Sequence, residues 1–84
     1  QPSGSLVKLP AGFTAQIHTQ APNFRAVVIQ GAIDLHQDQG TGAQRLGTGS
    51  YFGSEGPTTH RVVATGNGEH LLYIRADGRY EIAD

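Results

Sequence analysis

The sequence predicts an all-β domain, and three observations support this. Apolar residues do not recur with the spacing of an amphipathic helix. Twelve glycines and four prolines divide the chain into short segments, and these segments are rich in β-branched and aromatic residues. Turn signals such as Asn67-Gly68 and Asp77-Gly78 separate the later segments. About six to eight short strands with tight turns are typical of a β-sandwich or β-barrel.

The first half of the chain contains a series of short runs that we expect to be strands. Each run is apolar or alternating, and each ends at a proline, a glycine or a polar turn. The runs are Leu6–Leu9, Phe13–Thr19, Phe24–Gln30 and Ala32–His36. The stretch Gln37–Gln44 is polar and glycine-rich. It offers no side chain for a core, so we expect a surface loop there.

The second half repeats this pattern with shorter runs, for which we expect strands at Ser50–Phe52, His60–Ala64, Glu69–Arg75 and Arg79–Ile82. Gly47, Gly49 and Gly53 surround the first of these runs, which indicates a region where backbones approach closely. Asn67-Gly68 and Asp77-Gly78 each lie between two of the runs. Asn-Gly and Asp-Gly favour type I′ turns, so both predict β-hairpins.

Length and charge limit what the chain can be. Eighty-four residues suffice for one small domain with a thin core, which we place at 1–84. A formal net charge of −1 gives no basic surface for nucleic acid. The apolar runs are shorter than the ~20 residues of a membrane helix, so we expect no membrane insertion.

The chain contains no cysteine and no methionine. Without cysteine it has neither a disulfide framework nor a thiolate metal site, and it tolerates an oxidising compartment. Because Gln1 is not an initiator, signal-peptide removal and cleavage from a longer precursor both remain open. We expect a secreted or periplasmic location slightly in preference to a cytoplasmic one.

Glycine and histidine recur in two spaced sets. The first set is Gly12, His18, Gln20, Phe24 and Gly31, and the second is Gly49, Glu55, Pro57, His60 and Ala64. His18 and Gln20 are two residues apart, so their side chains leave the same face of a strand. Along Phe13–Thr19 polar residues alternate with apolar ones. Alternation alone would place His18 on the solvated face.

The spacing of both sets resembles the two cupin motifs, and the run from His18 to Gly31 is similar to a group of small, mostly uncharacterised cupins. That group has His-Thr-His, then Asp-Tyr-Arg-Gly-Val-Val-Ile before the glycine. The resemblance continues through Leu46–Phe52, His60 and Leu72–Gly78. It implies a jelly-roll barrel. Because only Ser5–Leu9 precedes the first motif, we expect N-terminal strands to be missing and residues 1–5 to be flexible.

Cupin motifs bring His, His and Glu from the first set and His from the second to a metal inside the barrel. The resemblance therefore implies that His18, Gln20 and His60 share one interior metal site. Gln20 and Phe24 replace a histidine and the glutamate, and a neutral amide is a poor ligand for transition metals. We expect a divalent metal (Zn, Fe, Mn or Ni) to bind weakly. The resemblance implies an interior ligand pocket lined by His18, Gln20, Phe24, Tyr51 and His60.

Four other side chains have separate expectations. We expect His36 on the surface, His70 half-buried before an apolar run, and Glu55 in a solvated loop near the barrel mouth. Arg25 lies on the face opposite Phe24, where it can pair with Glu or Asp from another strand or from another subunit.

These observations favour a cupin-barrel protein whose interior pocket binds a small ligand, a weakly held metal, or both. Two alternatives remain open: a metal-dependent oxygenase or isomerase, and a structural or sensory subunit with a degenerate metal site. Whether the protein is an enzyme stays open at this point. Missing strands would leave an open sheet edge, so we expect a homodimer, or association with a second chain or precursor fragment, to fill it.

Overall fold

A computed structural model describes residues 3–37 and 42–83, and these residues contain strands and no helix. The strands are β1 (Ser3–Leu9), β2 (Thr14–Thr19), β3 (Phe24–Gln30), β4 (Ala32–Gln37), β5 (Gln44–Leu46), β6 (Tyr51–Ser54), β7 (Thr58–Thr65), β8 (His70–Ala76) and β9 (Tyr80–Ala83). The all-β prediction is therefore confirmed. Within the described ranges nothing resembles a membrane-spanning helix.

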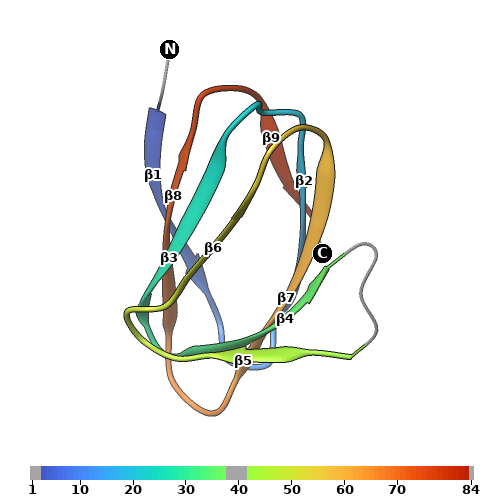
Figure 1. The fold of residues 1–84 in the computed structure, drawn as a ribbon. Coiled ribbons are helices and arrows are strands. Elements are labelled where there is room, and N and C mark those ends of the chain that lie inside the picture. Colours follow the sequence, from blue (N-terminus) through green and yellow to red (C-terminus); the bar gives the residue numbers. More distant parts are fainter. Residues whose placement is uncertain (1–2, 38–41, 84) are drawn as a thin grey trace.

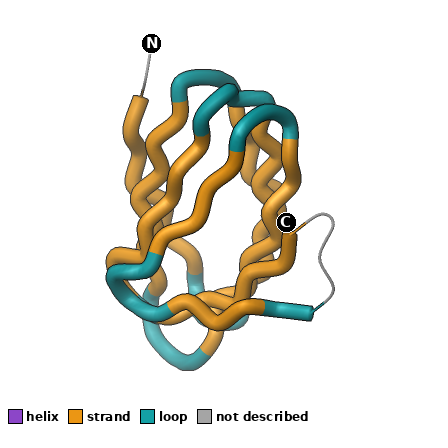
Figure 2. Tube along the Cα trace, in the orientation of Figure 1, coloured by secondary structure: helices purple, strands orange, loops and turns teal. Residues whose placement is uncertain are grey.

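Two antiparallel sheets face each other across the interior (Figures 1 and 2). One sheet has the order β1-β8-β3-β6 and the other has the order β5-β4-β7-β2-β9. Most consecutive strands lie in different sheets, so the chain crosses from one sheet to the other at most turns. This winding is that of a jelly roll.

The crossing of the chain overturns the two expected hairpins. β7 and β8, on either side of Asn67-Gly68, belong to different sheets, and so do β8 and β9, on either side of Asp77-Gly78. Gly66 and Gly68 have positive φ, whereas Asn67 does not, so the first turn is not type I′ either. Gly78 allows a close approach of two backbone segments, because a Cβ there would lie 2.8 Å from Ala21 Cα. The chain does turn at Asn67-Gly68 and at Asp77-Gly78, but the prediction that the strands on either side pair as hairpins was wrong.

The N-terminal strand is longer than expected. Ser3–Ser5 pair with Ile74–Ala76 as part of β1, so these residues are not a flexible segment; residues 1 and 2 lie outside the described residues. The described residues form nine strands in two sheets. That N-terminal strands are missing stays a prediction.

A further strand, β5, was not predicted. Only Leu46 of its three residues is apolar, and that side chain is 7% exposed. Across the β4–β5 hairpin Arg45 donates to Asp34 and holds the pKa of that carboxyl below its usual value. The loop expected at Gln37–Gln44 begins at the last residue of β4 and ends at the first residue of β5. Its residues 38–41 lie outside the described residues.

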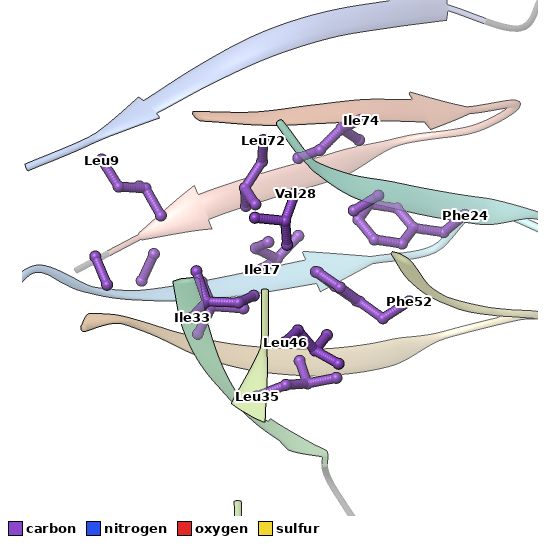
Figure 3. Close-up of a cluster of buried hydrophobic side chains, with 14 of the residues drawn as sticks. Leu9, Ile17, Phe24, Val28, Ile33, Leu35, Leu46, Phe52, Leu72 and Ile74 are labelled. Atoms are coloured by element: carbon purple, nitrogen blue, oxygen red, sulfur yellow. The ribbon is translucent and has the colours of Figure 1, made fainter. Parts of the chain in front are cut away.

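The core is apolar and draws on both sheets (Figure 3). Its largest fully buried side chains include Phe24, Ile17, Ile33, Leu72 and Ile74. Strand alternation produces this core, because buried and more exposed residues alternate along most of β2, β3, β7 and β8. These inward side chains occupy the space where a ligand pocket was expected.

Candidate functional site

His18 lies on the outer face of the five-stranded sheet. It is exposed, it stands opposite Thr59 on β7 and Glu81 on β9, and its Nδ1 is 2.9 Å from the Thr59 hydroxyl. Gln20, just beyond the end of β2, is also exposed. The alternation in β2 had predicted this solvated position, and the motif spacing had argued against it.

His60 lies on the other face of the same sheet. It stands opposite Ile17, and both side chains are buried. Since Ile17 and His18 are neighbours in one strand, their side chains point to opposite faces. The sheet therefore separates His60 from His18 and Gln20. The expectation that these three side chains enter one interior cavity is wrong, and the donor set does not fit a metal bound by His18, Gln20 and His60 together.

Phe24 and His60 pack together in the interior. Their rings are stacked, with centroids 5.3 Å apart and an angle of 18° between the planes. Phe52 meets His60 edge-on at 5.2 Å, and Tyr80 meets Phe24 edge-on at 5.8 Å. Phe24, Phe52 and neighbouring aliphatic side chains fill this part of the barrel (Figure 3). An aromatic core replaces the carboxylate site that the cupin resemblance implies.

Ser54 links His60 to the edge of the barrel. The Ser54 hydroxyl lies 3.0 Å from His60 Nε2. Ser54 also lines a shallow hollow of about 340 Å³ beside Arg25, Tyr51 and Glu55. Tyr51 is 72% exposed on the outer face of the four-stranded sheet. The sequence had predicted that Tyr51 and His18 line one interior pocket, and this prediction is wrong.

A larger hollow lies outside the barrel, along β2 and β9. Its volume is about 510 Å³, and it is lined by His18, Gln20, Arg79, Tyr80 and Glu81. The backbone N–H of Gln20 donates to the carbonyl oxygen of Arg79 at 2.9 Å, which ties the residue after β2 to the residue before β9. The hollow thus contains two of the predicted site residues, His18 and Gln20, together with the positively charged Arg79 and the negatively charged Glu81. The run Arg79–Ile82 was an expected strand, but no local signal showed that it pairs with β2.

The remaining predicted side chains have varied positions. His36 is half-buried, and Glu55 is exposed as expected. His70 is 1% exposed, more buried than predicted. Arg25 donates to its neighbour's carbonyl, Phe24 O, and among the described residues it forms no ion pair within 4.0 Å.

Asn23 stands where the group of small cupins that the sequence resembles has aspartate. Its backbone N–H and its side-chain amide both donate to the Asp77 carboxylate, at 2.9 and 3.2 Å. The Asn23 amide holds the pKa of Asp77 below its usual value. An aspartate at position 23 would instead place two carboxylates side by side.

We therefore predict that Asn23→Asp destabilises the domain most at neutral pH. In the parent, stability from the lowered pKa of Asp77 is present above the unfolded pKa and is lost as the pH falls through the folded one. In Asn23→Asp, carboxylate repulsion acts while both groups are ionised and fades on acidification. Thermal melts at several pH values measure this. Asn23→Ala is the control; if it melts at the same temperature as Asn23→Asp at neutral pH, repulsion is not the cause.

Comparison with known proteins places the chain in a family. Residues 1–83 match the model of the family described as "Domain of unknown function (DUF4437)". The chain belongs to this family. No curated protein sequence matches it. The family description assigns no activity to DUF4437 domains.

Solved structures support the fold of this DUF4437 domain. It is similar, with a TM-score of 0.77 and 16% identity, to an uncharacterized conserved protein with a double-stranded β-helix domain from Klebsiella pneumoniae, covering 99% of this chain and 75% of that one. It is also similar (TM-score 0.72, 22% identity) to a sugar phosphate isomerase from a cupin superfamily from Silicibacter pomeroyi. The match covers all of this chain and 57% of that one. The domain therefore has the cupin fold. The narrower resemblance to small cupins stays a prediction.

Proposed function

We propose that this domain binds a small hydroxylated anion, such as a sugar phosphate or sugar acid, in the hollow between β2 and β9. The observation that carries the proposal is the convergence of Arg79, Glu81, His18 and Gln20 on one hollow. Its volume of about 510 Å³ lies within the range usual for small-molecule sites. This replaces the interior pocket expected from the sequence, which packed side chains fill.

The chemistry of the lining suggests how such a ligand would be held. The Arg79 guanidinium is suited to a bidentate bond with a phosphate or carboxylate. Glu81 and Gln20 offer acceptors to hydroxyl groups, and the Gln20 amide also donates. His18 Nδ1 is engaged with Thr59, so Nε2 is the nitrogen available to a ligand. The neighbour from Silicibacter pomeroyi, described as a sugar phosphate isomerase, is consistent with this ligand class.

The test is an NMR titration with ribose 5-phosphate, gluconate and inorganic phosphate. We expect the amide signals of residues 18–20 and 79–81 to shift with one of the sugar ligands. Arg79→Ala should weaken that binding by about tenfold or more, because it removes a charged hydrogen bond. Arg61→Ala is the matched control, since Arg61 is exposed on β7 but does not line the hollow.

Two outcomes would contradict the proposal. One is that none of these amides shifts at about 10 mM ligand, a concentration that would detect even weak binding. The other is that Arg61→Ala weakens binding as much as Arg79→Ala. His18→Ala should leave the barrel folded, because His18 is exposed.

One observation favours a second candidate, a structural domain without a ligand. The stack of Phe24 on His60 leaves no place for a ligand in this part of the barrel interior. An unresponsive outer hollow in the titration above would favour this candidate.

A further inference from the structure

The chain contains two dipeptides in which glycine follows a residue that can form a cyclic succinimide, Asn67-Gly68 and Asp77-Gly78. In this reaction the backbone nitrogen of the glycine attacks the side-chain carbonyl carbon of the residue before it. Glycine favours the attack because it has no Cβ to hinder it and adopts backbone conformations that other residues avoid. The two dipeptides have different surroundings in the structure, and these surroundings predict different reactivity.

Asn67 lies in an exposed turn in which both reacting groups are accessible. Residues 66–69, between β7 and β8, are all exposed. Within the described ranges no hydrogen bond holds the Gly68 N–H or the Asn67 side-chain amide. Gly66 and Gly68 have positive φ, 77° and 89°. Because glycine accepts a wide range of backbone angles, the peptide between Asn67 and Gly68 can rotate until the nitrogen meets the amide carbon.

Asp77 and Gly78 are also exposed, but they are fixed. The Asp77 carboxylate accepts two hydrogen bonds from Asn23, at 2.9 and 3.2 Å, and the Asp77 N–H donates to Asn23 O at 3.2 Å. A Cβ at Gly78 would lie 2.8 Å from Ala21 Cα, so the glycine backbone packs closely against a second segment. Rotation toward a succinimide would break these contacts. Asp77 is therefore protected by the fold.

We propose that Asn67 is a site of spontaneous covalent modification, where deamidation in the folded protein produces a mixture of aspartate and isoaspartate while Asp77 is spared. Hydroxide removes the proton of Gly68 N, which then forms a bond to Asn67 Cγ. The Cγ–Nδ2 bond breaks, and ammonia leaves with a proton taken from water. A water molecule then opens the succinimide at one of its two carbonyl carbons. Opening at one carbon gives aspartate, and opening at the other gives isoaspartate, in which the main chain runs through Cγ.

Isoaspartate at this position would disturb the anchorage of His70, which is 1% exposed. The carbonyl oxygens of Thr65 and Gly68 lie at hydrogen-bonding distance of the two ring nitrogens of His70. Isoaspartate adds a backbone carbon to the span between these two carbonyls, so they cannot both keep their places on the ring. We expect the isoaspartate form to be less stable than the parent. The turn does not line the proposed ligand hollow, so this inference does not rest on the proposed function.

Incubation of the folded protein in mildly alkaline buffer tests the proposal, because hydroxide starts the reaction. Peptide mapping by mass spectrometry and labelling with an isoaspartyl methyltransferase identify the products. We expect conversion of Asn67, an unchanged amide at Asn23, and no isoaspartate at Asp77. In urea, where Asn23 no longer holds the Asp77 carboxylate, isoaspartate should also form at Asp77. Native protein in which Asn67 stays intact, or in which Asp77 converts as fast as in urea, would overturn the proposal.

Two variants identify the reacting residues. Gly68→Ala should slow the conversion of Asn67 by about tenfold or more, because a Cβ hinders the attacking nitrogen. A Cβ at Gly68 meets nothing within 4 Å, so the variant adds no clash. Asn67→Gln keeps a neutral amide but forms the corresponding larger ring slowly, so it should stay unmodified. Conversion of Gly68→Ala at the parent's rate, or isoaspartate in Asn67→Gln at the parent's level, would contradict this assignment.

The effect on His70 is measured on the modified protein, which ion exchange separates because deamidation adds a negative charge. The isoaspartate form should melt at a lower temperature than the parent, and its His70 ring signals should shift in NMR spectra. Asn67→Asp is the matched control, because it adds the same charge without the extra backbone carbon. Equal melting temperatures for the isoaspartate form and Asn67→Asp would show that the added carbon leaves the anchorage of His70 intact.

Discussion

Phe24→Glu is expected to destabilise the domain by about 4 kcal/mol or more, which is a large fraction of the stability of a small domain. This change restores the carboxylate that cupin motifs have at this position. In this protein, however, Phe24 is 0% exposed and stacks on His60. Glutamate would leave a cavity and bury an unpaired charge, and both effects are unfavourable. Urea unfolding followed by circular dichroism measures the change.

Phe24→Leu is the control for Phe24→Glu. It keeps the site apolar and should cost about 1–3 kcal/mol, less than the glutamate. A Phe24→Glu protein that remains as stable as the parent and binds Zn²⁺ tightly would show that the interior opens into a metal site. That result would contradict the packed core.

Gly31→Ala is expected to cost about 3 kcal/mol, the second-largest effect, from backbone strain and overpacking together. Gly31 has φ of +83°, and a Cβ there would lie 2.5 Å from the His70 ring. His70 is 1% exposed. Its two ring nitrogens lie at hydrogen-bonding distance of the Thr65 and Gly68 carbonyl oxygens, so the ring cannot turn aside without losing these contacts. Urea unfolding again provides the measurement.

Gly12→Ala separates the two causes. Gly12 has nearly the same φ, +81°, but a Cβ there would meet nothing within 4 Å. We expect this variant to lose only about 1 kcal/mol, from backbone strain alone. Equal losses in the two variants would mean that contact with His70 contributes nothing.

The positions of the strands could largely be predicted from sequence, because they depend on local patterns. Thr14–Thr19 and His70–Ala76 fall within a residue or two of the expected runs. The exception is Gln44–Leu46, whose single apolar residue gives no local signal; it becomes a strand through its pairing with β4.

The candidate site shows where prediction from sequence failed. His18 and His60 lie on adjacent strands of one sheet, β2 and β7, and not on strands that face each other across the barrel as the motif spacing had indicated. Spacing does not decide which face each side chain takes, because a shift of one residue reverses every face of a strand. The alternation of polar and apolar residues in Phe13–Thr19 contained that information and was outweighed by the resemblance.

By itself the sequence determined the all-β class, the cupin resemblance and the alternation of polar and apolar residues along β2, because periodicity and turn chemistry are local properties. Only the tertiary structure decided that the turns at Asn67-Gly68 and Asp77-Gly78 cross between sheets. It also decided that Arg79 and Glu81 join His18 in one hollow. These arrangements depend on pairing between strands far apart in the chain, and pairing follows from burial of the whole core.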